Sequence, residues 1–363
     1  MSAVQAVAKT RPGNFFEDFR LGQRIVHATP RTVTSGDVAL YTALYGPRFA
    51  VQSSDEFARA LGYPRAPIDD LLAFHIVFGK SVPDISLNAI ANLGYAECRF
   101  RAPVFTGDTL SATSEVIGLR ENSNAESGVV YVRTTGRNQH GATVLDYVRW
   151  VMVRKRDKAS PAPKPSVPKL DERVAPETLA TAVPRLSAGC YDGAMAGSAH
   201  GFEAYRAGER IDHIDGMTIE DAEHQLATRL YQNTAKVHFN AHRQAQDRNG
   251  RRLVYGGVII SLVRALSFNG LGNAFHIAAI NGGRHVAPCF AGDTIYAWSE
   301  VLECASLPQR SDVGALRVRM FGVKNASAHD TPGPDAAGKY PASVVLDLDL
   351  WLIVPRERCF AAS

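Results

Sequence analysis

The sequence predicts an α+β protein built from two tandem copies of one unit, in which an antiparallel sheet wraps around a central helix. Two observations carry this prediction. Matching blocks of sequence recur in the same order in the two halves of the 363-residue chain. In each half, an apolar segment with helical spacing is followed by several runs rich in Val, Ile, Tyr and Trp, which are typical of strands.

The duplication rests on three pairs of blocks. The first two pairs keep nearly the same spacing, and a Pro-, Gly- and Asp-rich insertion (residues 324–343) explains the wider spacing of the third. Chance similarity would not preserve both order and spacing, so the chain is a tandem repeat. The pairs are FEDFRLGQRI with FEAYRAGERI, RAPVFTGDTLSATSEVIGL with VAPCFAGDTIYAWSEVL, and VLDYVRWVMV with VLDLDLWLIV.

These blocks divide the chain into a first repeat, residues 1–154, and a second, residues 186–363. Residues 155–185 between them are rich in Pro, Lys and Ala and lack apolar periodicity, so we expect a semi-extended linker.

Each repeat has the signals of a helix that begins at a capping residue. Thr34 and Thr218 are each followed three positions later by an acid, a pattern that predicts a helix N-terminus. A second, apolar helix is expected over residues 71–79 and, in the other repeat, 257–268. The strand-like runs VVYVRTTG, TVLDYVRWVMV, ALRVRMFGV and SVVLDLDLWLIV complete the units. A long helix wrapped by a curved sheet is the hotdog fold, so the prediction is a double hotdog.

Composition excludes several classes of protein. The formal net charge is +4 and the basic residues are scattered, which argues against a nucleic-acid partner. The five cysteines form no C-x-x-C pair, and neither a secretory signal nor an apolar stretch of about 18 residues is evident. We expect a cytoplasmic protein without a membrane partner.

The candidate chemistry lies in residues 230–258 of the second repeat. Asn233, His238, Asn240 and His242 form a polar cluster, which is followed by the pair Gly256-Gly257 at the start of the apolar helix. Hydration of an enoyl thioester requires a base for water, a task that suits histidine. It also requires donors for the thioester oxygen, which a helix N-terminus supplies and glycine leaves accessible.

This segment resembles the hydratase motif of MaoC-like dehydratases and R-specific enoyl-CoA hydratases. His238 falls on the catalytic histidine of that motif, and Gly256 on the glycine whose N–H polarises the thioester carbonyl. Three positions depart from the motif: Asn233 stands for the catalytic Asp, Asn240 for a common Asp, and Tyr255 for a second His. Since Asn233 cannot accept a proton, His238 would have to serve as the only base, which favours syn addition.

Over its whole length the chain is similar to the mesaconyl-CoA hydratase family. The resemblance implies reversible hydration of mesaconyl-CoA (2-methylfumaryl-CoA) to β-methylmalyl-CoA in the ethylmalonyl-CoA route of bacteria, in a homodimer or larger oligomer. It implies an acyl-CoA substrate and no metal, nucleotide or flavin. The first repeat, with Pro47 in place of Asn233 and no equivalent of His238, would accommodate the acyl part. The substrate's free carboxylate would need an arginine, for which Arg229, Arg264 and Arg48 are candidates.

Several alternatives remain open. His238 and His242 have the spacing of a metal pair, although no third ligand is evident. The pair Gly256-Gly257 could be a tight turn only, and Arg251-Arg252 could meet coenzyme A phosphates or be solvated. Other functions compatible with the motif are hydration of a different enoyl-CoA, thioester hydrolysis, and binding of acyl-CoA without turnover.

Overall fold

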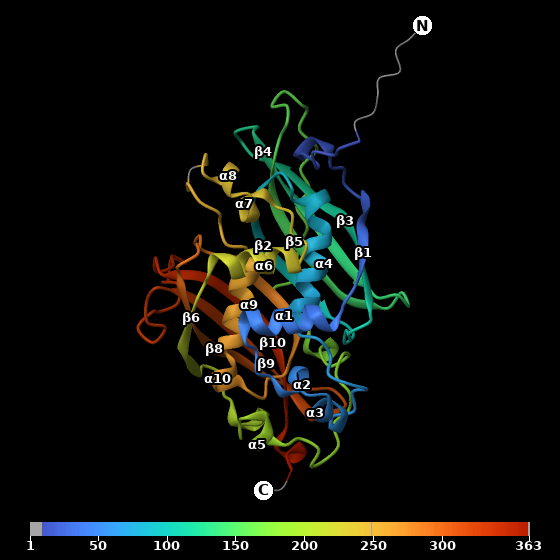
Figure 1. The fold of residues 1–363 in the computed structure, drawn as a ribbon, viewed down its shortest axis with the longest axis vertical. Coiled ribbons are helices and arrows are strands. Elements are labelled where there is room, and N and C mark those ends of the chain that lie inside the picture. Colours follow the sequence, from blue (N-terminus) through green and yellow to red (C-terminus); the bar gives the residue numbers. More distant parts are fainter. Residues whose placement is uncertain (1–8, 248, 362–363) are drawn as a thin grey trace.

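A computed structural model describes residues 9–247 and 249–361 of the chain. Its core is one ten-stranded antiparallel sheet in the order β1-β3-β4-β5-β2-β7-β10-β9-β8-β6 (Figure 1). The first five strands in this order belong to the first repeat and the last five to the second. Each repeat contributes the same arrangement of strands, read in opposite directions from the middle. The sheet therefore follows the duplication, and the double hotdog prediction is confirmed.

The elements of the first repeat begin with a short 3-10 turn, η1. They are η1 (Phe16–Asp18), β1 (Arg24–Thr32), α1 (Ser35–Tyr45), α2 (Ala50–Ser53), α3 (Asp55–Ala60), α4 (Asp70–Ile85), β2 (Ala89–Phe100), β3 (Thr109–Glu121), β4 (Ser127–Arg137) and β5 (Thr143–Arg154).

The linker and the second repeat add the remaining elements. They are η2 (Pro176–Thr178), α5 (Gly193–Ala196), η3 (Phe202–Ala204), β6 (Arg210–Thr218), α6 (Asp221–Leu230), α7 (Lys236–Phe239), α8 (Ala241–Gln244), α9 (Gly256–Leu266), α10 (Phe268–Leu271), β7 (His276–His285), β8 (Thr294–Leu307), β9 (Arg310–Lys324), β10 (Val344–Pro355) and η4 (Glu357–Cys359).

The two repeats join where β2 pairs with β7. In this antiparallel seam Tyr95 lies opposite Gly283 and Cys98 opposite Ile280. Because the seam lies in the middle of the sheet, neither repeat presents this edge to solvent. The two repeats therefore form one sheet and share one curved inner face.

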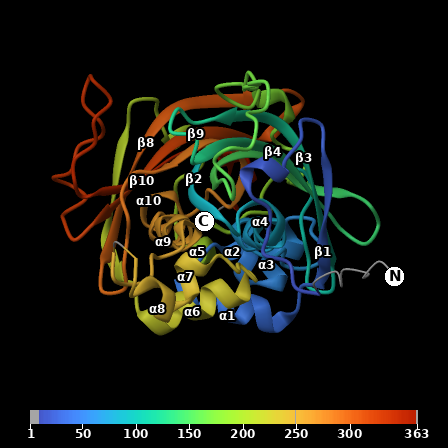
Figure 2. The same cartoon turned by 90° about the horizontal axis from the view of Figure 1, so that it is seen from above.

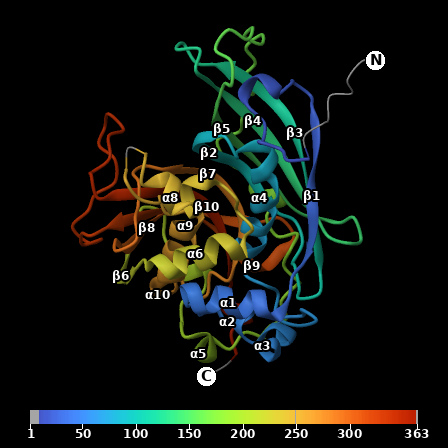
Figure 3. The same cartoon turned by 45° about the horizontal axis from the view of Figure 1, so that its top comes forward.

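Two helices lie side by side inside the curve of the sheet (Figure 2). These are α4 and α9, whose side chains are almost all buried in a core shared by both repeats. His75 of α4 contacts Ser261 of α9 at 3.1 Å between Nε2 and Oγ. α1 and α6 lie together in front of these helices (Figure 3). None of the helices over the described residues combines the length and apolarity that a transmembrane span requires.

The predicted helix starts have different outcomes. Thr34 caps α1 by accepting a hydrogen bond from the Asp37 N–H, as predicted. The prediction for Thr218 is wrong, because this residue ends β6 and Glu220 precedes α6. The central helix α4 continues to Ile85, beyond the expected residues 71–79. Pro83 interrupts the sequence pattern there, but Ile85 is fully buried, so packing continues through the last turn.

The predicted linker, residues 155–185, packs against the face of the sheet opposite the central helices. Ser166 exchanges two backbone hydrogen bonds with Leu119, both of 2.8 Å. Further along, the carbonyl oxygen of Val174 accepts a hydrogen bond from the Trp351 indole at 3.0 Å. The segment is therefore held along the sheet by specific contacts, although η2 is its only regular element.

Candidate active site

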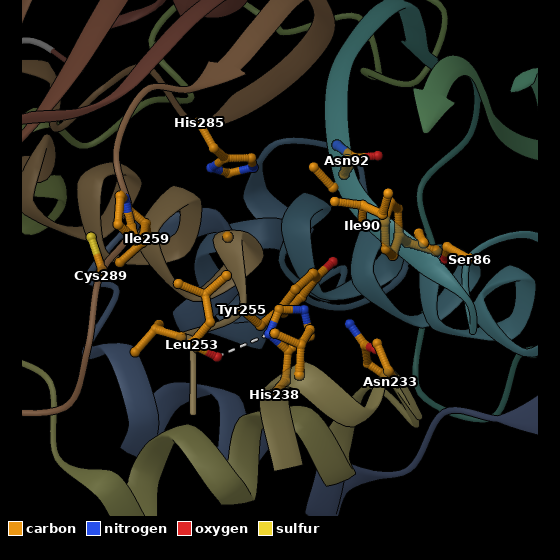
Figure 4. Close-up of a pocket in the computed structure, with 18 of the residues that line it drawn as sticks. Ser86, Ile90, Asn92, Asn233, His238, Leu253, Tyr255, Ile259, His285 and Cys289 are labelled. Atoms are coloured by element: carbon orange, nitrogen blue, oxygen red, sulfur yellow. Dashed lines mark hydrogen bonds between the residues drawn. The ribbon is translucent and has the colours of Figure 1, made fainter. Parts of the chain in front are cut away.

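A pocket of about 280 Å³ lies between the two repeats (Figure 4). The first repeat contributes side chains from α4, β2 and β5. The second contributes the segment around α7, the first turn of α9 and the end of β7. Asn233, His238 and Gly256, which the motif places at the site, all line this pocket. Residues far apart in the sequence are thus brought to one cavity by the pairing of the repeats.

His238 lies on the short helix α7 and faces the pocket. Its Nδ1 lies 2.9 Å from the carbonyl oxygen of Leu253, an atom that can only accept a hydrogen bond. Nδ1 therefore carries the hydrogen, and Nε2 has a free lone pair. The ring also packs against Tyr255, with 5.4 Å between ring centroids. Burial lowers the pKa of His238 to about 4, so the ring is neutral at neutral pH and can accept a proton.

Asn233 is 5% exposed and lies in the turn between α6 and α7. Its side-chain oxygen Oδ1 accepts a hydrogen bond from the Ala235 N–H at 3.1 Å. Since the oxygen is engaged there, the orientation of the amide is set, and the NH2 group is the part directed toward the pocket (Figure 4). The residue that replaces an acid in the motif therefore presents a donor.

Gly256 is the first residue of α9, so its N–H has no partner within the helix. A Cβ at this position would lie 2.3 Å from the ring of His285. Glycine is therefore required for backbone and ring to approach so closely. Gly257 has a different role: it is buried outside the pocket lining, against the rings of Tyr255 and His75.

Two further histidines shape the site and were missed by the sequence analysis. The Tyr255 N–H donates to Nε2 of His224 at 3.0 Å, which fixes the turn into α9. His285, at the end of β7, lines the pocket beside Gly256, and burial lowers its pKa to about 4. Neither lies in the motif segment, and His285 has no counterpart in the motif. The one feature of the sequence that could have indicated these two residues is the number of histidines in the second repeat.

The arginines proposed for the substrate carboxylate lie elsewhere. Arg229 is exposed on α6. Arg264 is buried, but its guanidinium binds Ser267 and the carbonyl oxygen of Ala274. Arg48 packs over the ring of Phe268. None of the three lines the pocket.

The remaining polar residues of the motif segment also lie outside the pocket lining. Asn240 caps α8 by accepting a hydrogen bond from the Arg243 N–H at 3.0 Å, and His242 is exposed on that helix. Within residues 9–247 and 249–361, no three His, Cys, Asp or Glu side chains are placed to hold a metal ion. Arg252 pairs with Asp221, and Arg251 packs over the ring of Phe290.

The corresponding region of the first repeat is filled by side chains. Gln52 occupies the position that matches His238, and its amide donates to the carbonyl oxygen of Phe275 at 2.7 Å. The ring of Phe49 lies 3.7 Å from the guanidinium carbon of Arg264. The cavity that remains there measures about 20 Å³. The first repeat therefore lacks both the base and the space.

Comparison with known proteins agrees with this site. The family model for mesaconyl-CoA hydratase matches residues 1–332. The chain belongs to the mesaconyl-CoA hydratase family. It is 63% identical to a β-methylmalyl-CoA dehydratase of Chloroflexus aurantiacus, covering 96% of this chain and 99% of that one. It is 59% identical to a mesaconyl-CoA hydratase of Cereibacter sphaeroides, covering 96% and 100%.

Solved structures of related proteins have the same fold. A MaoC domain protein dehydratase from Chloroflexus aurantiacus superposes with a TM-score of 0.94 at 62% identity, covering 96% of this chain and 99% of that one. A conserved Mycobacterium tuberculosis protein described as a double hotdog superposes with a TM-score of 0.71 at 27% identity, covering 95% and 99%. Family membership thus makes this chain a hydro-lyase of the MaoC-like group.

Proposed function

We propose that this protein catalyses the reversible hydration of mesaconyl-CoA to β-methylmalyl-CoA. The observation that carries the proposal is the arrangement of His238 and Gly256 in one pocket, with a free imidazole lone pair and a helix N–H that has no partner among the described residues. The chain is similar to a mesaconyl-CoA hydratase and to a β-methylmalyl-CoA dehydratase, and these two names describe the two directions of one reaction.

Asn233 and His238 hold the attacking water in this proposal. The Asn233 NH2 group donates to the water oxygen, and Nε2 of His238 accepts a hydrogen from it. The fixed orientation of both side chains supports this role, because each uses its other polar atom to bind the backbone. Water held in this way is oriented with its lone pair toward the substrate.

The Gly256 N–H donates to the thioester oxygen. Negative charge develops on that oxygen when water attacks the β-carbon, and the dipole of α9 favours it. His285 lies beside Gly256 and narrows this part of the pocket. The oxygen of water bonds to the β-carbon, and the water proton passes to His238. The same imidazolium then delivers a proton to the α-carbon, which gives syn addition and regenerates the neutral base.

Purified protein incubated with mesaconyl-CoA tests the proposal directly. We expect loss of the enoyl-thioester absorbance and formation of β-methylmalyl-CoA, and the same mixture is expected from the product side. Turnover of crotonyl-CoA without turnover of mesaconyl-CoA would point to a different hydratase. Release of free thiol in a DTNB assay would point to a thioesterase, and binding without turnover to an acyl-CoA-binding protein.

We also propose a cytoplasmic homo-oligomer. Both edge strands of the sheet expose a large apolar side chain, Val26 on β1 and Ile214 on β6, with exposed fractions of 73% and 75%. The unpaired edge of a sheet can pair with a strand of another subunit, and these exposed apolar side chains are compatible with such a contact. Size-exclusion chromatography with light scattering measures the mass directly, and a mass of one chain would contradict this part of the proposal.

A further inference from the structure

One end of the pocket contains polar groups that the proposed hydration chemistry does not use. This end is formed by the first repeat and includes Ser86, Asn92 and Arg149. None of the described residues that line the pocket is Asp or Glu. Arg149 is the only Arg or Lys among them, and it carries a positive charge at neutral pH. The charge of the pocket is therefore suited to an anion.

Arg149 is a buried cation without an anionic partner. It lies on β5 opposite Tyr95, and none of its surface is exposed. Its guanidinium donates to Ser81 at 2.8 Å and to Ser86 at 3.3 Å, and its Nε has no hydrogen-bond partner. No carboxylate within residues 9–247 and 249–361 forms an ion pair with it. A buried charge with only neutral partners is costly, so an anion supplied by a ligand would offset part of that cost.

The other repeat shows that the fold does not require this arginine. Arg149 belongs to the block VLDYVRWVMV, which matches VLDLDLWLIV in the second repeat. The matching position is Leu350, a fully buried residue of the core. The same place in the same sheet is thus filled by an apolar side chain where no active pocket adjoins it. Packing of the sheet therefore does not require a charge at this position.

Ser86 and Asn92 connect this charge to the cavity. The Ser86 oxygen accepts the hydrogen bond from Arg149, which leaves the hydroxyl hydrogen free to donate into the pocket. Neither amide atom of Asn92 has a hydrogen-bond partner in the described part of the chain, although both atoms are buried. In Figure 4, Ser86 and Asn92 lie on one side of the pocket and Cys289 on the other.

We propose that Ser86 and Asn92 bind the free carboxylate of a dicarboxylic enoyl-CoA, and that Arg149 positions and polarises Ser86 from behind. This inference rests on the proposed hydratase function and names the residues that bind the free carboxylate of the substrate. Charge-assisted hydrogen bonds of this kind discriminate strongly between a carboxylate and a methyl group.

The same contacts assist the reaction. Water attacks the carbon that bears the carboxylate in mesaconyl-CoA, so an uncompensated negative charge there opposes addition of the water oxygen. Hydrogen-bond donors to the carboxylate reduce the effect of its negative charge on the attacked carbon. They also hold the β-carbon near His238. Removal of these donors is therefore expected to lower kcat as well as to raise KM.

The test compares mesaconyl-CoA with 2-methylcrotonyl-CoA, in which a methyl group replaces the carboxylate. The variants are Arg149→Leu, which copies Leu350, together with Ser86→Ala, Asn92→Ala and Arg149→Lys. Arg120→Leu, an exposed arginine on β3, is the matched control. For mesaconyl-CoA we expect kcat/KM to fall by about 100-fold in Arg149→Leu and by about 10-fold in Ser86→Ala and Asn92→Ala.

For 2-methylcrotonyl-CoA the same variants are expected to keep the wild-type kcat/KM within about threefold, and Arg149→Lys is expected to recover part of the selectivity. If the variants lose kcat/KM equally with both substrates, the proposed carboxylate site is refuted. The hydratase function would still hold in that case, provided that the wild-type protein hydrates mesaconyl-CoA. A wild-type protein that does not hydrate mesaconyl-CoA would instead refute the function. If Arg149→Leu does not fold, Ser86→Ala and Asn92→Ala decide the question, since each removes only a few atoms.

Discussion

The imidazole of His238 donates its Nδ1 hydrogen to the carbonyl oxygen of Leu253 at 2.9 Å. This single contact determines which nitrogen of the ring is free to act as a base. It also joins α7 to the turn that leads into α9, so the base and the helix N-terminus are held relative to each other. The catalytic geometry therefore depends on a backbone carbonyl, where many enzymes use a carboxylate to orient a histidine.

Replacement of His238 by Gln, the residue at the matching position of the first repeat, is expected to lower kcat by about 10³-fold, because a neutral amide cannot accept the water proton. Progress curves of mesaconyl-CoA hydration measure this loss. The control is His242→Ala on the neighbouring helix, for which we expect wild-type activity. Loss of activity in His242→Ala would support a metal pair instead.

Replacement of Asn233 by Asp is expected to lower kcat by about 10-fold or more, because a carboxylate cannot donate to the water oxygen. The new negative charge beside His238 favours the protonated ring, so the acid limb of the kcat/KM profile should move to higher pH. Rate and pH profile are both measured with mesaconyl-CoA. An Asp variant with an unchanged profile would exclude any special role for Asn233.

The pKa of His238, lowered to about 4 by burial, predicts a pH profile unusual for a histidine enzyme. The active form is the neutral ring, which persists until the pH falls below that pKa. We therefore expect kcat/KM to stay level between pH 8 and about pH 5 and to decline near pH 4. A decline centred near pH 6.5 would show that the imidazole is solvated in the free enzyme.

Replacement of Gly256 by Ala is expected to abolish most of the activity, because the new Cβ would lie 2.3 Å from the His285 ring and displace it. The double variant with His285→Ala removes this clash and should recover the folded stability lost in the single variant. Gly36→Ala is the matched control: this exposed helical glycine has only the Thr34 hydroxyl within reach, at 3.5 Å. Thermal melting and kcat are measured for all three proteins.

Three buried histidines, His75, His213 and His224, predict how stability changes with pH. Burial lowers their pKa values to about 3, 4 and 3, respectively. Between those values and the unfolded pKa of about 6.5, the unfolded chain binds more protons than the folded chain. The free energy of unfolding should therefore fall with decreasing pH, by about 1.4 kcal/mol per histidine and pH unit. Urea midpoints at pH 7.5 and 5.5 measure the change, and equal midpoints would contradict the prediction.

The fold could be predicted because the duplication shows each helix and strand pattern twice in the sequence. Two helices and two sets of strands with matching sequence support each other, even where one signal misleads, as at Thr218. The sites on the motif segment, Asn233, His238 and Gly256, could likewise be placed together, since they lie close in sequence. The base and the helix N-terminus are separated only by the short helix α8 and the loop that follows it.

The rest of the pocket could not be predicted because it comes from the other repeat and from strands. Arg149 lies in a run that predicts only a strand, and Asn92 lies outside the strand-like runs of the sequence. Their approach to the pocket depends on the β2–β7 seam. One signal was available: Arg149 stands at a position where the matching block of the second repeat has the apolar residue Leu350. A charge at a position that is apolar in the matching block makes that position a candidate for a special task.

Fusion of the two hotdog units into one chain allows their pocket walls to differ. In a symmetric dimer of identical subunits, any side chain introduced at one position is repeated at the equivalent position of the other subunit. A single polypeptide escapes that constraint, so Arg149 can coexist with Leu350. Because the two repeats are free to differ in sequence, one repeat can place a charged side chain beside the pocket while the other keeps an apolar side chain at the matching position.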